Sequence, residues 1–266
     1  MSDYKICGVD LDEIHNVQLE ILDEVDRLCK ENGIKYFLSG GTLLGAIRHK
    51  GFIPWDDDID LWMTRQNYQK FKKALKTQMS SKYCAVDYFS DIRFPLSIMK
   101  IEKVGTRYVE GVFSNIDIAS GIYIDVFPLD NIWLPAYKLQ TAILIKLQSV
   151  RDFKLRNDGK KNAGFAKRII YSLIPLTVCR MLTEVTMRLF NVFPTEYKNQ
   201  LCHRGRYWPK FNKSDVEDLI DTEYCEKLYP VPRNYDQILR KCYGDYMQLP
   251  PDDKRQPIHN IIECKL

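Results

Sequence analysis

The chain has 266 residues, of which 45% are hydrophobic and 28% are charged, and its formal net charge is +4. These values are ordinary for a globular protein and allow one large domain, or a core domain with an appended one. The mild positive charge suits an anionic substrate or a membrane surface, and no Lys/Arg stripe interleaved with aromatic residues indicates nucleic acid binding.

The cysteines and the N-terminal residues exclude further classes of protein. The eight cysteines are scattered without a C-x-x-C pair, which argues against a zinc ribbon or a dense disulfide framework and favours reduced thiols. Residues 1–12 have no apolar signal core, and the chain has no run of about 20 uncharged apolar residues. We therefore expect a cytoplasmic protein without a transmembrane helix.

The first predicted element is a helix that begins at Leu11. Asp10 and Glu13 match a capping box, the following apolar residues have helical spacing, and Gly33 is a typical C-terminal stop. Residues 35–39 are predicted as a short strand that leads into a Gly-Gly turn.

The Gly-Gly turn and the helical turns predicted over 42–48 form a candidate phosphate site. Glycine lets backbone N–H groups approach a ligand closely, and a helix N-terminus favours an anion. Basic side chains at the end of this segment can add positive charge. The predicted phosphate-binding residues are Gly40, Gly41, Thr42, Arg48, His49 and Lys50.

An acidic cluster follows, with four aspartates at positions 56, 57, 58 and 60. We predict a strand over 57–63, which places Asp58 and Asp60 on one face, about 6–7 Å apart, where they can share a divalent cation. Asp57 would face away, and Asp56 would share the face of Asp58 if the strand begins that early. A solvated loop is the alternative, but the apolar neighbours of these aspartates argue against it.

A second acidic strand is predicted after the helix at 65–78 and the strands at about 83–89, 95–103 and 106–110. The run 122–127 is apolar and β-branched apart from Asp125. A lone carboxylate in such a strand is costly unless it is paired or binds a metal. We expect Asp125 to face Asp58 and Asp60; the alternative is an exposed strand end stopped by Pro128.

Residues 136–193 are predicted to be helical, with a kink or break at Pro175. Apolar runs in this region lie beside Lys160, Lys161, Lys167 and Arg168. We favour a helical layer packed on the sheet. Peripheral contact with the inner face of an anionic membrane through residues 140–180 remains the alternative.

The C-terminal part is rich in aromatic residues and prolines, typical of a segment wrapped over a site. Tyr243 and Tyr246 could hold a quaternary ammonium group by cation–π attraction, or they could be ordinary packing residues.

Four segments together resemble one family. The sequences GGTLLGAIRH at 40–49 and PWDDDID at 54–60 closely resemble the LicD family of bacterial phosphocholine transferases, which has fukutin-type proteins as eukaryotic relatives. Residues 124–130 resemble its second acidic strand, and residues 243–251 resemble its closing segment. Residues 131–200 carry no matching motif.

The resemblance implies a nucleotidyltransferase fold of the mixed α+β class, with a small mixed sheet flanked by helices. We expect residues 1–130 to form the catalytic core. Residues 131–266 would form a helical middle segment and an aromatic-rich C-terminal wrap, a substrate-binding or lid region packed on that core as one unit.

The resemblance also implies transfer of phosphocholine, or a similar phospho-alcohol, from a CDP-linked donor to a hydroxyl of a teichoic acid or lipopolysaccharide precursor, with release of CMP. Asp58, Asp60 and Asp125 would be the catalytic residues and the ligands of Mg²⁺ or Mn²⁺. Two alternatives stay open: a nucleotidyltransferase that releases pyrophosphate, and an inactive scaffold for glycan assembly.

Overall fold

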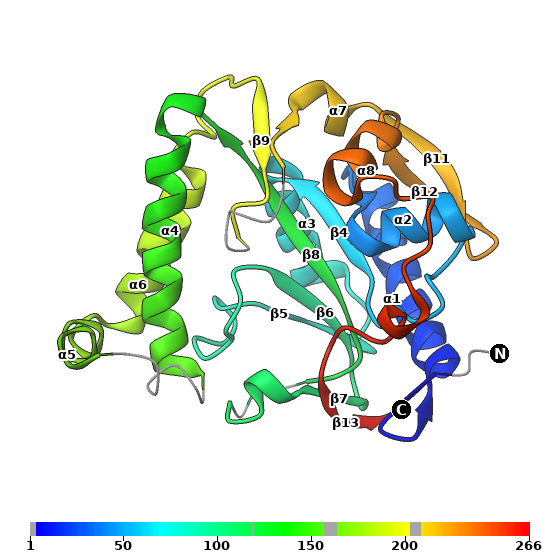
Figure 1. The fold of residues 1–266 in the computed structure, drawn as a ribbon, viewed down its shortest axis with the longest axis horizontal. Helices are drawn as coiled ribbons and strands as arrows, with labels where there is room; N and C mark the ends of the chain where they lie inside the picture. Colours follow the sequence, from blue (N-terminus) through cyan, green and yellow to red (C-terminus); the bar gives the residue numbers. More distant parts are fainter. Residues whose placement is uncertain (1–3, 117, 119, 157–163, 203–208) are drawn as a thin grey trace.

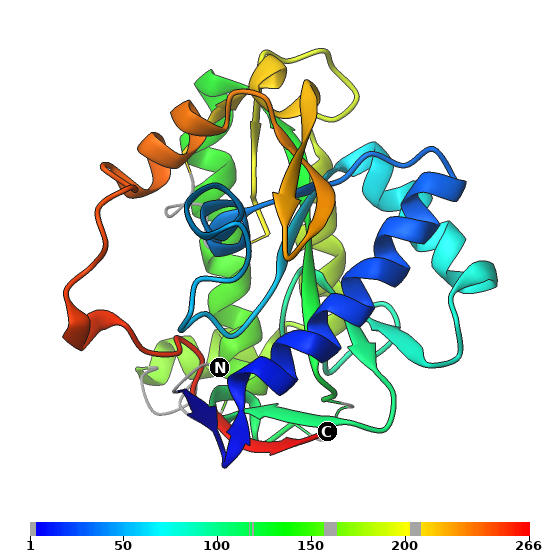
Figure 2. The same cartoon turned by 90° about the vertical axis from the view of Figure 1, so that its right-hand side faces the viewer.

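The computed structural model describes residues 4–116, 118, 120–156, 164–202 and 209–266. Its centre is a mixed seven-stranded sheet, with α1 (Leu11–Glu31) and α2 (Gly40–His49) on one side and α4 (Leu134–Leu155) on the other (Figures 1 and 2). The predicted α+β class is confirmed. The other helices are α3 (Arg65–Gln78), α5 (Phe165–Leu173), α6 (Leu176–Arg188), α7 (Lys213–Glu217), α8 (Tyr235–Tyr243) and the 3-10 turns η1 (Gly111–Phe113) and η2 (Asp252–Lys254).

The strands of the large sheet are β3 (Phe37–Leu38), β4 (Asp60–Thr64), β5 (Tyr83–Val86), β6 (Met99–Lys103), β8 (Tyr123–Ile132), β9 (Tyr197–Asn199) and β10 (Phe211–Asn212). Three two-stranded sheets consist of β1 (Lys5–Ile6) with β2 (Val9–Asp10), β11 (Leu219–Tyr224) with β12 (Lys227–Pro232), and β7 (Arg107–Glu110) with β13 (Ile261–Lys265). β8 is the central strand. It runs parallel to β4 on one side and antiparallel to β6 and β9 on the other.

β8 continues beyond Pro128 to Ile132, so the alternative that Asp125 sits at an exposed strand end is wrong. β6 pairs with residues 123–126 and β9 with residues 130–132, so Pro128 lies in the gap between these two neighbours. A proline is tolerated there because no neighbour on that side needs its missing N–H group. Asp125 is 7% exposed.

The early helices agree with their predictions except at their N-termini. α1 ends before Gly33, which has the expected left-handed φ of 59°. The predicted capping box does not form: Asp10 makes no side-chain cap bond and pairs with Lys5 at 2.8 Å instead. α2 begins at Gly40, so the two glycines are its first residues and not a turn before it.

The acidic strand begins at Asp60, three residues later than predicted. Backbone carbonyl groups of Asp56 and Asp57 bond to side chains of α1: His15 Nε2 lies 2.7 Å from the Asp56 oxygen, and Gln18 Nε2 donates to the Asp57 oxygen at 2.9 Å. These bonds hold the aspartates before β4 in an irregular, buried conformation.

The middle of the chain is helical, as predicted, and Pro175 separates α5 from α6, whose axes differ by 85°. Within the described part of the chain, no single helix has the length and apolar composition needed to cross a membrane, although the bent pair α5–α6 meets both criteria together. Lys160 and Lys161 lie outside the described residues.

The two predicted regions share the large sheet. β8 passes through the predicted boundary between residues 130 and 131 and pairs with β9 of the second region. The later part of the chain returns to the first region through β13, which pairs with β7. The functional division into a catalytic core and a lid remains a prediction.

Candidate active site

A cavity of about 700 Å³ lies beside the N-terminal ends of β4 and β8, where Asp60 and Asp125 are, and extends to α4. The predicted residues Gly41, Asp58, Asp60, Asp125 and Tyr243 all line it. Charged residues that the sequence analysis did not assign to a site also line it: Lys100, Glu110, Arg151, Asp152, Arg156 and His259.

The parallel pairing of β4 and β8 brings two of the predicted carboxylates together. Asp60 and Asp125 are direct Cα partners in the register, and the Asp125 N–H donates to the Ile59 carbonyl at 2.8 Å. Residues opposite each other on neighbouring strands point to the same face. Asp58 precedes β4 but lines the same cavity, so the structure brings the three predicted aspartates to one wall.

Crowding of these buried carboxylates favours their protonated forms. Burial is the main cause and raises the pKa of Asp60 well above its ordinary value, with further contributions from Asp58 and Asp125. Burial also raises the pKa of Asp58 to about 6. A cavity wall of this kind is unfavourable for anionic carboxylates unless a cation balances their charge.

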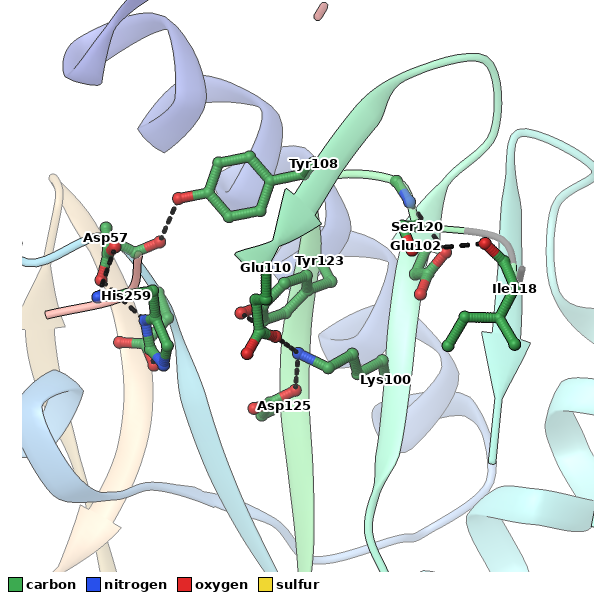
Figure 3. Close-up of polar contacts among 12 residues, drawn as sticks. Asp57, Lys100, Glu102, Tyr108, Glu110, Ile118, Ser120, Tyr123, Asp125 and His259 are labelled. Atoms are coloured by element: carbon green, nitrogen blue, oxygen red, sulfur yellow. Dashed lines mark hydrogen bonds and ion pairs between the residues drawn. The ribbon is translucent and has the colours of Figure 1, made fainter. Parts of the chain in front are cut away.

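The buried ammonium group of Lys100 contacts Asp125 on β8. Lys100 Nζ lies 3.3 Å from Asp125 Oδ1 and 3.0 Å from Glu110 Oε1, and the Tyr123 hydroxyl donates to the same Glu110 oxygen (Figure 3). Lys100 is the register partner of Asp125 on β6. Alternation along the strand predicted over 95–103 could have shown to which face of the sheet Lys100 points. It could not have shown that this strand pairs with β8.

Asp57 is bound to a residue 202 positions away. Its Oδ1 lies 2.9 Å from His259 Nδ1, and its Oδ2 accepts the His259 backbone N–H at 3.2 Å (Figure 3). Burial opposes the charged imidazolium, but the hydrogen bond to Asp57 and the charge of Asp58 raise the pKa of His259 to about 10. Asp57, Asp58 and His259 also form a compact group of potential metal-binding atoms.

Asp56 explains why the second residue of α2 is glycine. A Cβ on Gly41 would lie 2.5 Å from Asp56 Oδ2, so a larger residue would displace this carboxylate. The Thr42 hydroxyl accepts the Asp60 backbone N–H at 2.8 Å, which fixes the start of β4 against the start of α2. These contacts are structural reasons for the motif; its role in holding a phosphate remains a prediction.

The three predicted basic residues at the end of α2 lie in different places. Arg48 donates to the Tyr246 carbonyl at 2.7 Å and lines a neighbouring cavity of about 420 Å³. His49 packs edge-on against Trp55. Lys50 is exposed and pairs with Glu223 at 3.3 Å, and it lines neither cavity.

The predicted tyrosines line the neighbouring cavity together. Tyr243 is shared by both cavities, whereas Tyr246 lines the smaller one and donates its hydroxyl to Asp236 at 2.8 Å. Trp55 is also shared by the two cavities. The C-terminal part of the chain therefore contributes Tyr243 where the two spaces join, beside Trp55 from the acidic segment.

Arg151 and Arg156 bring positive charge to the large cavity from α4 and the residue after it. Arg151 is 5% exposed, donates to the Ser97 hydroxyl, and has no hydrogen-bond partner at Nε within the described residues. No sequence signal indicated either residue, because the segment 131–200 carries no motif.

Comparison with known proteins agrees with this geometry. Residues 33–132 match the family model described as LicD/FKTN/FKRP, nucleotidyltransferase domain. The chain is 31% identical over 261 residues to the lipopolysaccharide cholinephosphotransferase LicD of Haemophilus influenzae, an alignment that covers 93% of this chain and 95% of the relative. The chain belongs to the LicD family. It is therefore a phosphotransferase, and the predicted resemblance is confirmed.

Two further proteins match shorter stretches of the chain. The human ribitol 5-phosphate transferase FKRP is 62% identical over 29 residues, which is 11% of this chain and 6% of the relative. The mannosyltransferase regulator 4 of Saccharomyces cerevisiae is 29% identical over 113 residues, or 41% of this chain and 9% of the relative.

Proposed function

We propose that the protein transfers phosphocholine, or a similar phospho-alcohol, from a CDP-linked donor to a hydroxyl of a cell-surface glycan precursor of the lipopolysaccharide or teichoic acid type, with release of CMP. The observation that carries this proposal is the in-register pair Asp60 and Asp125 in a cavity that also holds Asp58. The similarity to a lipopolysaccharide cholinephosphotransferase along nearly the whole chain supports the type of acceptor.

The carboxylate wall fits a hard divalent cation. Carboxylate oxygens are the donor set that suits Mg²⁺ or Mn²⁺, and a cation would stabilise the ionised forms of Asp58 and Asp60 that burial and the neighbouring carboxylates disfavour. We assign Asp58, Asp60 and Asp125 as its ligands. Bound there, the metal would neutralise charge on the donor diphosphate.

The alternative group of Asp57, Asp58 and His259 fits a metal less well. Both carboxylate oxygens of Asp57 already bond to His259, through the imidazole Nδ1 and the backbone N–H, so this pair is satisfied within the fold. We assign Asp57 and His259 a positioning role beside the site.

The other residues of the large cavity would bind and orient the two substrates. Arg151 and Arg156 face the cavity from the α4 side and would contact the anionic donor by charge-assisted hydrogen bonds. The acceptor hydroxyl would attack phosphorus in line, and an Asp125 oxygen would accept its proton. Most of the rate increase would come from positioning and electrostatics, as in other phosphoryl transfers.

The aromatic junction of the two cavities would hold the alcohol of the donor. Trp55 and Tyr243 line both spaces, and an aromatic face attracts a quaternary ammonium by about 0.5–2 kcal/mol. A choline group would gain this attraction, whereas glycerol or ribitol would not.

The test is release of CMP from CDP-choline with Mg²⁺ and a crude glycan acceptor, with wild type and Asp60→Asn assayed together. We expect metal-dependent CMP from the wild type alone. If CDP-ethanolamine, CDP-glycerol or CDP-ribitol gives CMP instead, the assignment of choline as the transferred alcohol is wrong, but the proposed reaction class stands. Release of pyrophosphate from CTP would show nucleotidyl transfer, and metal binding without turnover of any donor would indicate a scaffold.

A further inference from the structure

The surface formed by α5 and α6 is apolar in a way that packing inside this protein does not explain. None of the nine residues of α5 is buried, although most are apolar. Phe165, Ile169 and Leu173 follow the i, i+4, i+8 spacing of one helix face, and they are 81%, 48% and 75% exposed. Tyr171 anchors the helix by packing edge-on against Phe153 of α4.

α6 differs from an ordinary surface helix in which side chains it buries and which it exposes. Its buried side includes Arg180, which donates to the carbonyl groups of Ile92 and Phe94, and Glu184, which accepts from Tyr88. Its outward side carries apolar residues, with Met181 61% and Val185 57% exposed. A helix that buries Arg180 and Glu184 and exposes apolar side chains such as Met181 suits an apolar environment outside.

The charges on this surface have one sign. Glu184 is the only acidic residue of the sequence 164–195, and it is buried. The exposed charged residues of this described stretch are Lys167, Arg168 and Arg188. Apolar side chains with basic neighbours are typical of a helix that lies in the interface of an anionic bilayer. A second copy of the chain on the same face would instead bring like charges together.

We propose that α5 and α6 dock the protein on the surface of an anionic lipid bilayer, with their outward apolar side chains inserted among the lipids. The assignment does not depend on the reaction that the cavity performs. It does place the cavity close to the lipid, because α4 packs on α6 and also lines the cavity through Arg151 and Asp152 (Figure 1). This arrangement would suit a lipid-linked glycan acceptor if the proposed function holds.

The first test is co-sedimentation of the full chain with vesicles of phosphatidylcholine alone and with vesicles that also contain phosphatidylglycerol. We expect binding to the anionic vesicles that weakens as salt increases. The double variant Ile169→Asp with Leu173→Asp should bind at least about tenfold more weakly, because it places two charges in the inserted face. Val104→Asp with Leu228→Asp changes two equally exposed apolar residues elsewhere and should bind like the wild type.

The second test separates charge from apolar insertion. Lys167→Gln with Arg168→Gln should weaken binding to the anionic vesicles by about tenfold or more, whereas the matched pair Lys73→Gln with Lys76→Gln on α3 should not. Circular dichroism and thermal melting would confirm that each variant is folded. The proposal is overturned if the wild type stays unbound, if it binds both vesicle types equally, or if the two α5 variants pellet like the wild type. It is equally overturned if the wild type is an unbound dimer that Ile169→Asp with Leu173→Asp converts to a monomer.

Discussion

The central strand carries two buried aspartates that have different surroundings at its two ends. Asp125 lies at the cavity with one cation, Lys100, at 3.3 Å. Asp130, five residues later and therefore on the opposite face, is 0% exposed and accepts two hydrogen bonds from Arg65 at 2.8 and 2.6 Å and one from Asn191.

The difference separates a carboxylate that is satisfied within the fold from one that we propose binds a ligand. The Arg65 fork satisfies Asp130 within the fold, so no ligand is needed there. The carboxylates at the other end crowd one another around an open volume, and burial raises their pKa values. Burial alone therefore does not identify the site; the balance of charge around each carboxylate does.

The largest expected effect tests the functional end. Asp60→Asn should lower turnover by about a thousandfold or more, because one charge of the proposed metal site is lost. The fold should stay intact, since the substitution also relieves repulsion with Asp58 and Asp125. Steady-state CMP release and thermal melting measure the two effects. Normal turnover in this variant, or in Asp58→Asn, would show that the metal assignment is wrong.

The structural end should respond in the opposite manner. Asp130→Ala leaves the Arg65 guanidinium buried without its main partner and should lower the free energy of unfolding by about 3–5 kcal/mol. Urea denaturation measures this loss. Turnover per folded molecule at low temperature should stay within a fewfold of wild type, and a loss as large as that of Asp60→Asn would remove the distinction between the two ends.

Two glycines of α2 allow the same comparison between an effect on stability and an effect on activity, with smaller expected changes. A Cβ on Gly45 would lie 2.4 Å from the Gly51 backbone oxygen, so Gly45→Ala should cost about 1–3 kcal/mol of stability. A Cβ on Gly41 meets the Asp56 side chain, which can rotate away, so Gly41→Ala should keep most of the stability and lose activity. The reverse pattern would mean that Asp56 serves only to hold α2 in place.

The smallest expected effect concerns Asp57. Asp57→Asn should reduce turnover by about tenfold, less than either Asp58→Asn or Asp60→Asn, because Asp57 acts through His259. The three variants should be compared under the same metal concentration. An equal loss in all three would contradict the positioning role and favour the metal group that includes His259.

Local patterns predicted the helices and the parts of the site that share one segment. The acidic motif and the apolar run around Asp125 led us to expect one carboxylate wall, and the register of β4 with β8 places Asp60 beside Asp125. Asp58 lines the same cavity but precedes β4, so the predicted strand alternation is not what brings it there. The pairing of two strands determines which of their side chains share a face, because residues opposite each other on paired strands point the same way.

Contacts between distant segments could not be predicted in this way. The capping role of Asp10 was wrong because Lys5 competes for its carboxylate. The start of β4 was wrong because His15 and Gln18 of α1 hold the preceding backbone. Arg151 and His259 have no local signal, since their proximity to the aspartates depends on how α4 and the segment before β13 cross the sheet.

The bond between Asp57 and His259 has a consequence for how the protein is made. His259 lies 202 positions after Asp57, so the ribosome synthesises the acidic motif long before its imidazole partner. During that interval the nascent chain carries several aspartates that lack this counter-charge. The Asp57–His259 bond therefore forms only after the rest of the acidic motif has long been synthesised.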